Sequence, residues 1–335
     1  MVVDVEILLV YKVYIMSQNK KIKTLFLIIL VLSLLFGILY GRERSLKKNF
    51  ARKIAVSTLE LEKKLDYLNQ VILEESLSPA KLEKFVDLLK VYSVEDENGP
   101  IKLIRIGREG DGGYLSPVPA LKAADALFGY GVKDDISFEE DFSTKFNKPS
   151  FGFDCSVESI EINNSLTNFI PECLGTDEFL YNPYNSLKIS TFNQQIQDLA
   201  LENKKIFIKM DIEGAEYETF SEILESSKNI PAIVMELHLG RDVPDQFNKA
   251  LKLLSDLNKN FYLLNVHGNN CGWESFVTNN SKGKIPKLLE LTFINKNLVT
   301  KAKISDDQSH PSKLDMPNCN HKKDFDFEVL IEKSK

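Results

Sequence analysis

The segment KIFIKMDIEGAEYETF, Lys205–Phe220, decides the fold class of this chain. Its apolar run, residues 206–210, has the length of a buried strand in a parallel sheet. The run stops at Asp211, and Glu213 and Gly214 follow before a helical pattern begins. Carboxylates and a glycine between a strand and a helix are typical of a site at the carboxyl edge of an α/β sheet, although they also simply favour a helix start. The segment therefore predicts an α/β fold with Asp211 and Glu213 as candidate site residues.

A strand, a glycine turn and a helix start also follow one another between residues 126 and 140. Gly129 and Gly131 form the turn, and Ser137 with Glu140 has the S-x-x-E pattern of a capping box. Glycines between a strand and a helix let the backbone approach a nucleotide or another cofactor closely. We therefore interpret this turn as a candidate cofactor-binding loop.

Polar side chains stand at the ends of the other strand-like segments as well. The strand FGFDCS ends at Asp154, where a carboxylate can hold a ribose diol. PAIVMELHL and FYLLNVHGNNCGW contribute Glu236, His238, His267, Asn269, Asn270 and Trp273. Because the carboxyl ends of parallel strands meet at one edge of a sheet, these groups together predict an enzyme site there.

The order of the elements predicts the architecture of the domain. Strands and helices alternate from residue 123 to residue 295, which indicates a doubly wound, mostly parallel sheet with helices on both faces. The last two strand-like segments, 261–266 and 288–295, have no helix between them and are expected to form an antiparallel edge pair. The glycine-rich segment 104–117 predicts a tight turn or hairpin, either over a ligand or as a plain turn.

Charge and cysteine content exclude several classes of function. The 335 residues carry a net charge of −6, but residues 1–53 hold ten Lys and Arg against three Asp and Glu. The rest of the chain is therefore strongly acidic and unsuited to nucleic acid, which needs clustered basic residues. The four cysteines form no C-x-x-C pair, so we expect no zinc site, and their use in disulfides depends on the compartment.

The N-terminal part of the sequence predicts a membrane anchor. A basic tail over residues 1–23, with Met16 as an alternative start, precedes the uncharged residues 24–40, which are just long enough to cross a thin bilayer. A cleaved signal peptide is the alternative. We expect a type II protein of the Golgi or endoplasmic reticulum with a lumenal domain, and the sequons at Asn163 and Asn279 permit glycosylation there.

A helical stem is expected over residues 41–98, ahead of a domain over residues 99–330. Apolar residues recur at helical spacing between Ile54 and Ile72, as in an amphipathic helix or in a coil that makes a homodimer. A further helix is expected to begin at Ser78-Pro79.

Five segments together carry a resemblance to a known family: GYGVKDDISFEE, FGFDCS, CLGTDE, FIKMDIEGAEYETF and IVMELHL. They resemble the FkbM-type S-adenosylmethionine-dependent methyltransferases, and GREGDGGYL and HGNNCGW further resemble an animal branch of methyltransferase-like proteins expanded in nematodes. The resemblance covers about residues 100–330 and implies the class I methyltransferase fold. It also implies that S-adenosylmethionine lies over Gly129, Gly131 and Asp135, with its ribose at Asp154 and its adenine near Asp177.

The resemblance implies O-methylation of a small hydroxylated molecule, for which the acceptor proton must be removed. Candidates for the base are Asp211, Glu213 and His238. In a variant of this mechanism, Asp211, Glu236 and Asn270 hold a divalent metal ion. His267, Asn269 and Trp273 are candidate contacts for the acceptor.

The sequence thus predicts an O-methyltransferase that acts on a glycan or another small polar acceptor in the secretory pathway. Two alternatives stay open. A Golgi-type glycosyltransferase would use the D-x-E at residues 211–213 for a metal ion. A catalytically inactive binding domain on a membrane stalk would need none of this chemistry.

Overall fold

The computed structural model describes residues 78–176, 188–239, 246–272 and 275–331. The predicted tail, the anchor over residues 24–40 and most of the stem lie outside these ranges, as do Asp177 and Trp273. None of the helices in the described ranges is long and apolar enough to cross a membrane.

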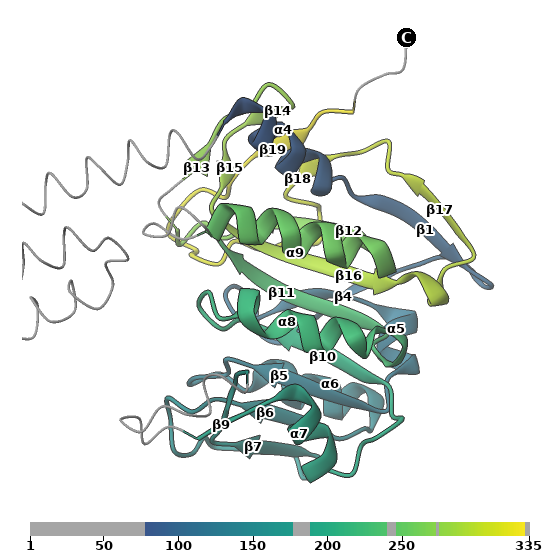
Figure 1. Cartoon of the computed structure of the whole chain (residues 1–335), viewed down its shortest axis with the longest axis vertical. Coiled ribbons are helices and arrows are strands. Elements are labelled where there is room, and N and C mark those ends of the chain that lie inside the picture. Colours follow the sequence, from purple (N-terminus) through teal and green to yellow (C-terminus); the bar gives the residue numbers. More distant parts are fainter. Residues whose placement is uncertain (1–77, 177–187, 240–245, 273–274, 332–335) are drawn as a thin grey trace, which may run out of the picture. The chain divides into compact units, whose positions relative to one another are not determined.

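A seven-stranded sheet forms the centre of the described part, with the strand order β12-β16-β11-β10-β5-β6-β7 (Figure 1). The strands are β5 (Ala126–Tyr130), β6 (Ser150–Phe153), β7 (Thr167–Ile170), β10 (Ile206–Met210), β11 (Ala232–His238), β12 (Phe261–Gly268) and β16 (Leu288–Asn295). Strands β7, β6, β5, β10 and β11 are mutually parallel, and β16 is antiparallel to both β11 and β12. The predicted mostly parallel sheet with an antiparallel pair is confirmed, although the last strand is inserted beside β11 and leaves β12 at the edge.

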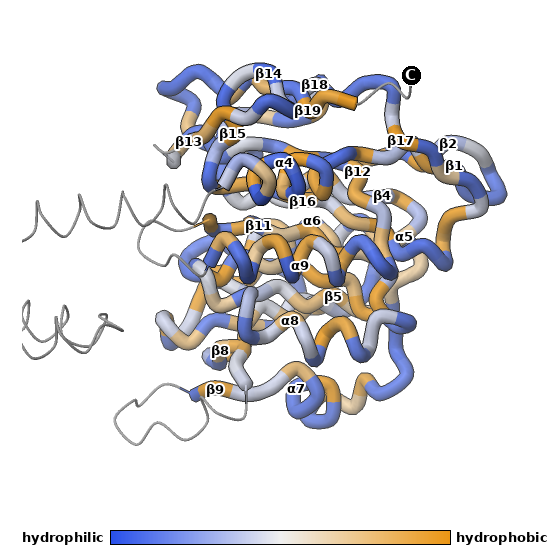
Figure 2. Tube along the Cα trace, turned by 45° about the horizontal axis from the view of Figure 1, so that its top comes forward, coloured by the Kyte–Doolittle hydropathy of each residue, from blue (hydrophilic) through white to orange (hydrophobic). Residues whose placement is uncertain are grey.

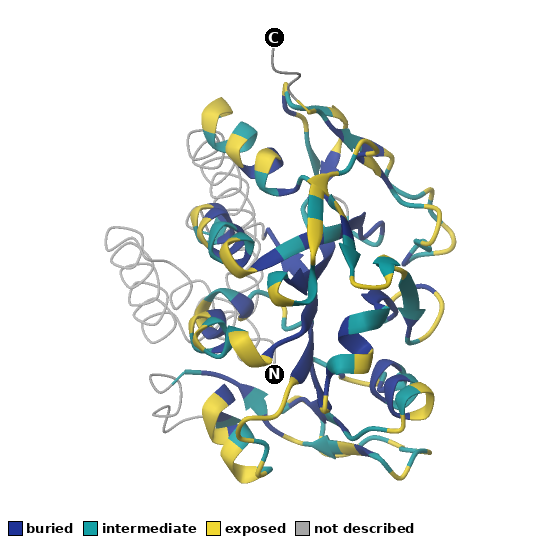
Figure 3. Cartoon of the chain, turned by 90° about the vertical axis from the view of Figure 1, so that its right-hand side faces the viewer, coloured by how far each residue is buried: buried dark blue, intermediate teal, exposed yellow. Residues whose placement is uncertain are grey.

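Helices cover both faces of this sheet. On one face lie α4 (Pro79–Leu88), α7 (Phe192–Asp198), α8 (Glu216–Glu225) and α9 (Gln246–Asn260), and on the other lie α5 (Val118–Ala123) and α6 (Ser137–Phe146). Buried strands run between helices whose outer surfaces are exposed (Figure 3). α9 alternates between hydrophobic and hydrophilic residues, as expected of a helix with one face on a core (Figure 2). The described part is thus a mixed α/β unit that is compatible with a Rossmann-like fold.

Strand β10 lies in the middle of the sheet because it has apolar side chains on both faces, with Lys209 as the one charged residue among them. Ile206, Ile208 and Met210 belong to the core cluster under α8 and α9, whereas Phe207 belongs to the cluster under α5 and α6. Met210 is in register with the last residue of β5 and with Met235 of β11. The residues that follow β5 and β10 therefore emerge side by side at one edge of the sheet.

The domain begins earlier in the chain than residue 99. Helix α4 contributes Phe85, Val86 and Leu89 to the core, and β1 (Tyr92–Asp96) pairs with β17 (Lys301–Ile304) and β2 (Gly99–Pro100). The stem expected up to residue 98 therefore does not include residues 79–96, because their apolar side chains are buried in the domain. The helix start predicted at Ser78 is confirmed, since the Ser78 hydroxyl caps α4 by accepting from the Lys81 amide.

The glycine-rich segment forms the predicted hairpin, between β3 (Leu103–Ile106) and β4 (Tyr114–Pro117). The helix predicted at Ser137 also begins there, but the capping box does not form. The Ser137 hydroxyl accepts from the Arg108 amide, and Glu140 accepts from the amides of Asn163 and Asn164. The N-cap residue of α6 is Ile136, and the preceding Asp135 accepts from the amide of Ser137, the first residue of the helix.

Short strands complete the described part. They are β8 (Cys173–Leu174) with β9 (Ile189–Ser190), β13 (Ser275–Phe276) with β15 (Ile285–Pro286), and β19 (Phe327–Val329) between β14 (Ser281–Gly283) and β18 (Ser309–His310). Two of the short strands, β17 and β18, lie within residues 300–325. All four cysteines are paired, as Cys155–Cys173 and Cys271–Cys319.

Candidate active site

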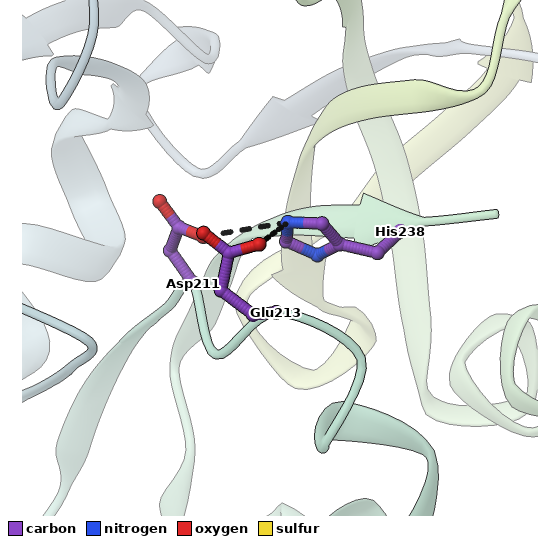
Figure 4. A group of neighbouring side chains, drawn as sticks. All are labelled: Asp211, Glu213 and His238. Atoms are coloured by element: carbon purple, nitrogen blue, oxygen red, sulfur yellow. Dashed lines mark ion pairs between the residues drawn. The ribbon is translucent and has the colours of Figure 1, made fainter. Parts of the chain in front are cut away.

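Asp211, Glu213 and His238 meet at the carboxyl edge of the sheet (Figure 4). Asp211 and Glu213 come from the turn after β10, and His238 is the last residue of β11. The His238 Nε2 atom lies 3.8 Å from Asp211 Oδ1 and 3.5 Å from Glu213 Oε2. All three side chains offer a ligand atom within 4.8 Å of the others. The structure thus brings together the three residues predicted to be catalytic.

The strand order reverses between β5 and β10, and the site lies at this point. Strands β5, β6 and β7 lie on one side of the reversal, and β10 and β11 on the other. A Cβ atom on Gly131 would lie 1.6 Å from the Asp211 carbonyl oxygen, so the two turns are in direct contact. Ligands of open α/β sheets bind at the carboxyl ends of the strands where the order reverses.

Two more carboxylates surround the His238 imidazole. Glu236 Oε2 lies 3.1 Å from Nε2, and Glu216 Oε1 lies 3.4 Å from Nδ1. Glu216 is fully buried and also accepts from the backbone amides of Gly214 and His238. Glu216 was not predicted, although it is the last acid of the motif DIEGAE.

Two polar side chains from distant segments hold the acids of the site. Tyr114, on β4, donates from its hydroxyl to Asp211 Oδ2 across 3.5 Å. Asn269, in the turn after β12, donates from Nδ2 to Glu236 Oε1 across 2.6 Å. Asn269 was predicted to contact the acceptor, and the structure gives it this contact with a site carboxylate. Tyr114 was not predicted, although the hairpin that carries it was.

Burial and the neighbouring charges shift the pKa values of Asp211 and His238. Burial raises the pKa of Asp211 to about 6, against the lowering influence of Lys209, and the neighbouring Glu236 raises it further. Burial would lower the pKa of His238, but its contacts with Glu216 and Glu236 outweigh burial and raise the pKa to about 11. In this arrangement His238 is an imidazolium held among carboxylates, which leaves Asp211 as the better placed proton acceptor.

Gly129, which was predicted to be part of the glycine turn, lies within β5, and both this residue and the turn after β5 are closely packed against protein atoms. A Cβ atom on Gly129 would lie 1.6 Å from Glu139 Oε1. Glu139 is fully buried, and both of its carboxylate oxygens have no hydrogen-bond partner among the described residues. Lys209 lies under the same turn and donates to the carbonyl oxygens of Tyr130 and Gly131 across 3.3 and 3.1 Å. Internal packing is therefore sufficient to explain the glycine at position 129.

Asp154 binds the same turn from the end of β6. Its Oδ2 accepts from the Lys133 amide across 2.8 Å, and its Oδ1 accepts from the backbone amide and the hydroxyl of Ser156. Asp135 forms an ion pair with Arg108 of the hairpin, with Nε and Oδ2 3.0 Å apart. An open cavity of about 440 Å³ lies beside these residues, lined by residues 133–137, Glu140, Val157 and residues 159–161.

The other predicted site residues are engaged elsewhere. His267 is fully buried, and its ring nitrogens lie 2.8 Å from Glu290 and 3.1 Å from Asp324, which together raise its pKa to about 10 against the effect of burial. Asn270 donates to the carbonyl oxygens of Cys319 and Lys322 and accepts from the Cys319 amide. These contacts bind the C-terminal segment to the sheet, which gives both residues a structural role.

Comparison with known proteins adds no relative to this description. No family model matches the chain, and a search of curated proteins finds no significant match.

Proposed function

We propose that this protein is an S-adenosylmethionine-dependent O-methyltransferase. The observation that carries the proposal is the cluster of Asp211, Glu213 and His238 at the point where the strand order reverses. A seven-stranded sheet with its last strand inserted antiparallel beside the fifth is also the arrangement expected of the class I methyltransferase fold. The resemblance of the five sequence segments gives the same fold independently.

The cofactor half of the proposed site is the region around β5 and β6. Asp154 reaches the turn after β5 through the Lys133 amide, and the cavity of about 440 Å³ lies beside that turn. Each carboxylate oxygen accepts more than one hydrogen bond, so the Asp154 oxygen bound to Lys133 can also accept from a ribose hydroxyl. Asp135 and Asp177 stay predicted neighbours of the cofactor, and Asp177 lies outside the described residues.

The acceptor half is the cluster after β10 and β11. In the proposed reaction the acceptor oxygen attacks the methyl carbon of the sulfonium, the new O–C bond forms as the C–S bond breaks, and sulfur keeps the electron pair. The hydroxyl proton passes to Asp211, whose side chain is 26% exposed and adjoins the reacting edge. His238 lies 3.8 Å away and stabilises the Asp211 carboxylate.

The acceptor that we propose is a hydroxyl of a glycan or of another small polar molecule. Two disulfides join all four cysteines, and disulfides persist in secretory compartments rather than in the cytosol. Hydroxyls of glycans are abundant in those compartments. This supports the predicted lumenal site of action, which also rests on the anchor predicted over residues 24–40.

Methyl transfer from labelled S-adenosylmethionine to a panel of glycans, small hydroxylated lipids and peptides tests the proposal. We expect label on oxygen, with turnover reduced by about 10²–10⁴-fold in Asp211→Asn and cofactor affinity little changed. Label on peptide nitrogen or carboxylate would refute the glycan acceptor while sparing methyl transfer. Absence of any transfer, together with absence of cofactor binding, would refute both.

A glycosyltransferase is the second candidate, because Asp211 and Glu213 stand two residues apart at the edge of the sheet with a ligand atom each in the same cluster. Such a pair could hold the metal ion of a nucleotide sugar. Transfer of a labelled sugar from a nucleotide sugar, in the absence of methyl transfer, would favour this candidate.

A further inference from the structure

We propose that Asp211, Glu213, Glu236 and His238 form a binding site for one divalent cation. Asp211, Glu213 and His238 each offer a ligand atom within 4.8 Å of the others at the carboxyl edge of the sheet, and Glu236 approaches this group through His238. Measured from His238 Nε2, the carboxylate oxygens of Glu236, Glu213 and Asp211 lie at 3.1, 3.5 and 3.8 Å. Neighbouring ligands of an octahedral cation lie about 3 Å apart when each metal–ligand bond is about 2.1 Å. The observed separations are close to that spacing.

Three of the atoms that face away from the cluster lie beside another polar group. Tyr114 binds Asp211 Oδ2, Asn269 binds Glu236 Oε1, and Glu216 faces His238 Nδ1 at 3.4 Å. Asp211 Oδ1, Glu236 Oε2 and His238 Nε2 are thereby directed toward one another. A carboxylate behind the distal nitrogen of a histidine, and donors behind ligand carboxylates, are the usual supports of a metal site.

His238 provides an observation that is independent of the acids. Its side chain is 9% exposed, and its Nδ1 atom has no hydrogen-bond partner of good geometry among the described residues. A small rotation of the ring would let Nδ1–H donate to Glu216, which leaves the lone pair of Nε2 directed at the three carboxylates. This is the tautomer in which histidine binds a metal ion, so binding of the cation releases the second proton of the imidazolium that the metal-free site holds.

The charges of the described side chains also favour the binding of a cation here. Four carboxylates surround His238, namely those of Asp211, Glu213, Glu216 and Glu236, and three of these four residues are mostly or fully buried. The Lys209 ammonium lies nearby but is bound to the carbonyl oxygens of Tyr130 and Gly131. Buried charges are stable only when they are paired or bind a metal ion, and one imidazolium leaves this cluster with an excess of negative charge.

The donor set favours a particular class of cation. Three carboxylates suit Mg²⁺ and Mn²⁺, and an imidazole among them suits Mn²⁺ better than Mg²⁺. Four protein ligands leave about two octahedral positions for water or for acceptor oxygens. The site does not depend on the methyltransferase proposal, because its ligands all come from the turn after β10 and from the end of β11.

Titration of the purified full-length chain with Mn²⁺ tests the site without cofactor or acceptor. Binding is measured as the loss of the electron paramagnetic resonance signal of the free ion. We expect one Mn²⁺ per chain. Glu213→Gln should weaken binding at least about tenfold, and this variant should fold normally because the Glu213 side chain is 88% exposed. The matched control is Glu218→Gln, which removes a carboxylate from the first turn of α8 that pairs with Lys249 outside the cluster.

Competition by Mg²⁺ and Zn²⁺ identifies the preferred ion. Tyr114→Phe removes the hydroxyl that donates to Asp211, and we expect it to lower Mn²⁺ affinity less than Glu213→Gln does. Three results would overturn the proposal. They are absence of Mn²⁺ binding to the folded wild-type chain at millimolar concentration, unchanged binding in both Glu213→Gln and Asp211→Asn, and equal weakening in Glu218→Gln. Because the Mn²⁺ titration contains no cofactor, its outcome does not depend on the proposed methyl transfer, which the transfer assay tests separately.

Discussion

Glu213 shows how the backbone of a single residue is adapted to the site. Its φ of 54° lies in the left-handed region, and Gly214 follows with a φ of 101°. A side chain in that region costs about 1–2 kcal/mol, which glycine avoids. The turn nevertheless carries glutamate at this position, and the Glu213 carboxylate is directed at His238. Strained residues of this kind concentrate at functional sites.

The first prediction compares two variants at this position. Glu213→Gly and Glu213→Ala both remove the carboxylate, but only glycine relieves the backbone. We expect Glu213→Gly to have a free energy of unfolding about 1 kcal/mol above that of Glu213→Ala, measured by urea denaturation. Both variants should lose Mn²⁺ affinity equally. A less stable glycine variant would show that the positive φ carries no strain.

Glu139 makes the stability of the fold depend on pH. Burial raises its pKa to about 7, although Lys209 opposes the shift. Above a pH of about 4.5 the unfolded chain loses this proton while the folded state keeps it, so stability falls as pH rises from about 4.5 to about 7. The loss amounts to about 3 kcal/mol and then stays constant at higher pH.

The second prediction is that Glu139→Gln abolishes this loss, because glutamine stays neutral. Urea midpoints of both proteins across the same pH range should diverge in favour of the variant until about pH 7 and run parallel beyond it. Glu140→Gln, which changes the neighbouring acid on α6, is the control and should follow the wild-type profile. Parallel profiles of wild type and Glu139→Gln from the outset would show that Glu139 titrates normally.

At the scale of elements, the contact between the end of β5 and the start of α6 determines where the strands must carry glycine. Gly129 on β5 and Gly152 on β6 are directly paired in the sheet. A Cβ atom on Gly129 would meet the carboxylate of Glu139 on α6, whereas one on Gly152 would be 3.1 Å from the ends of Ile136 and Val132. Helix α6 therefore packs against Gly129 through the Glu139 side chain.

The third prediction follows from this contact. Gly129→Ala should lower the free energy of unfolding by about 3 kcal/mol, and adding Glu139→Ala should restore most of it because the colliding group is gone. Gly152→Ala should cost less and should gain nothing from Glu139→Ala. Thermal unfolding of the wild type and of these four variants measures this. If the double variant stays as unstable as Gly129→Ala, packing against α6 does not explain the glycine.

Elements were predictable where the sequence pattern is local. The five parallel strands have apolar runs and polar ends, and the periodicity locates all of them except β7, whose residues 167–170 include only two strong apolar side chains. The insertion of β16 between β11 and β12 was not predictable, because strand pairing depends on contacts between distant segments. For the same reason the predicted helix α4 was assigned to the stem and β1 was not predicted, since α4 packs on α9 and β1 pairs with β17.

The site residues that lie at the ends of strands were predictable from the sequence. Asp211, Glu213 and His238 follow directly from the strand pattern, and the structure brings them together. Tyr114 and Glu216 were missed, because the first arrives from a hairpin almost a hundred residues earlier and the second lies inside a helix. The contacts of His267 with Glu290 and Asp324 were not predictable, because a histidine at a strand end gives no sign of the distant carboxylates that enclose it.

At the scale of the whole molecule, the disulfides relate the fold to its compartment. They close loops of 18 and 48 residues, which corresponds to about 3 and about 4 kcal/mol of stabilisation in the chain-entropy description. Cys271–Cys319 joins the turn beside the site to the C-terminal segment. The domain therefore depends on an environment that keeps these bonds oxidised.

The fourth prediction is that the chain is inserted with its domain in the secretory lumen. Protease added to sealed microsomes should leave the domain intact, and its thiols should react with an alkylating reagent only after denaturation and reduction. Microsomes opened with detergent are the control, in which the domain should be digested. Digestion in sealed vesicles, with four reactive thiols, would place the domain on the cytosolic side.

The most direct measurement for the central claim is calorimetric titration of the full-length chain with S-adenosylmethionine, and separately with nucleotide sugars. We predict one cofactor per chain and no binding of nucleotide sugars. Asp154→Asn should weaken cofactor binding by about 1.5–3 kcal/mol, whereas Ser156→Ala, which removes a hydroxyl that donates to Asp154 but keeps its carboxylate, should weaken it less. Binding of a nucleotide sugar without S-adenosylmethionine, or equal affinity in wild type and Asp154→Asn, would contradict the account.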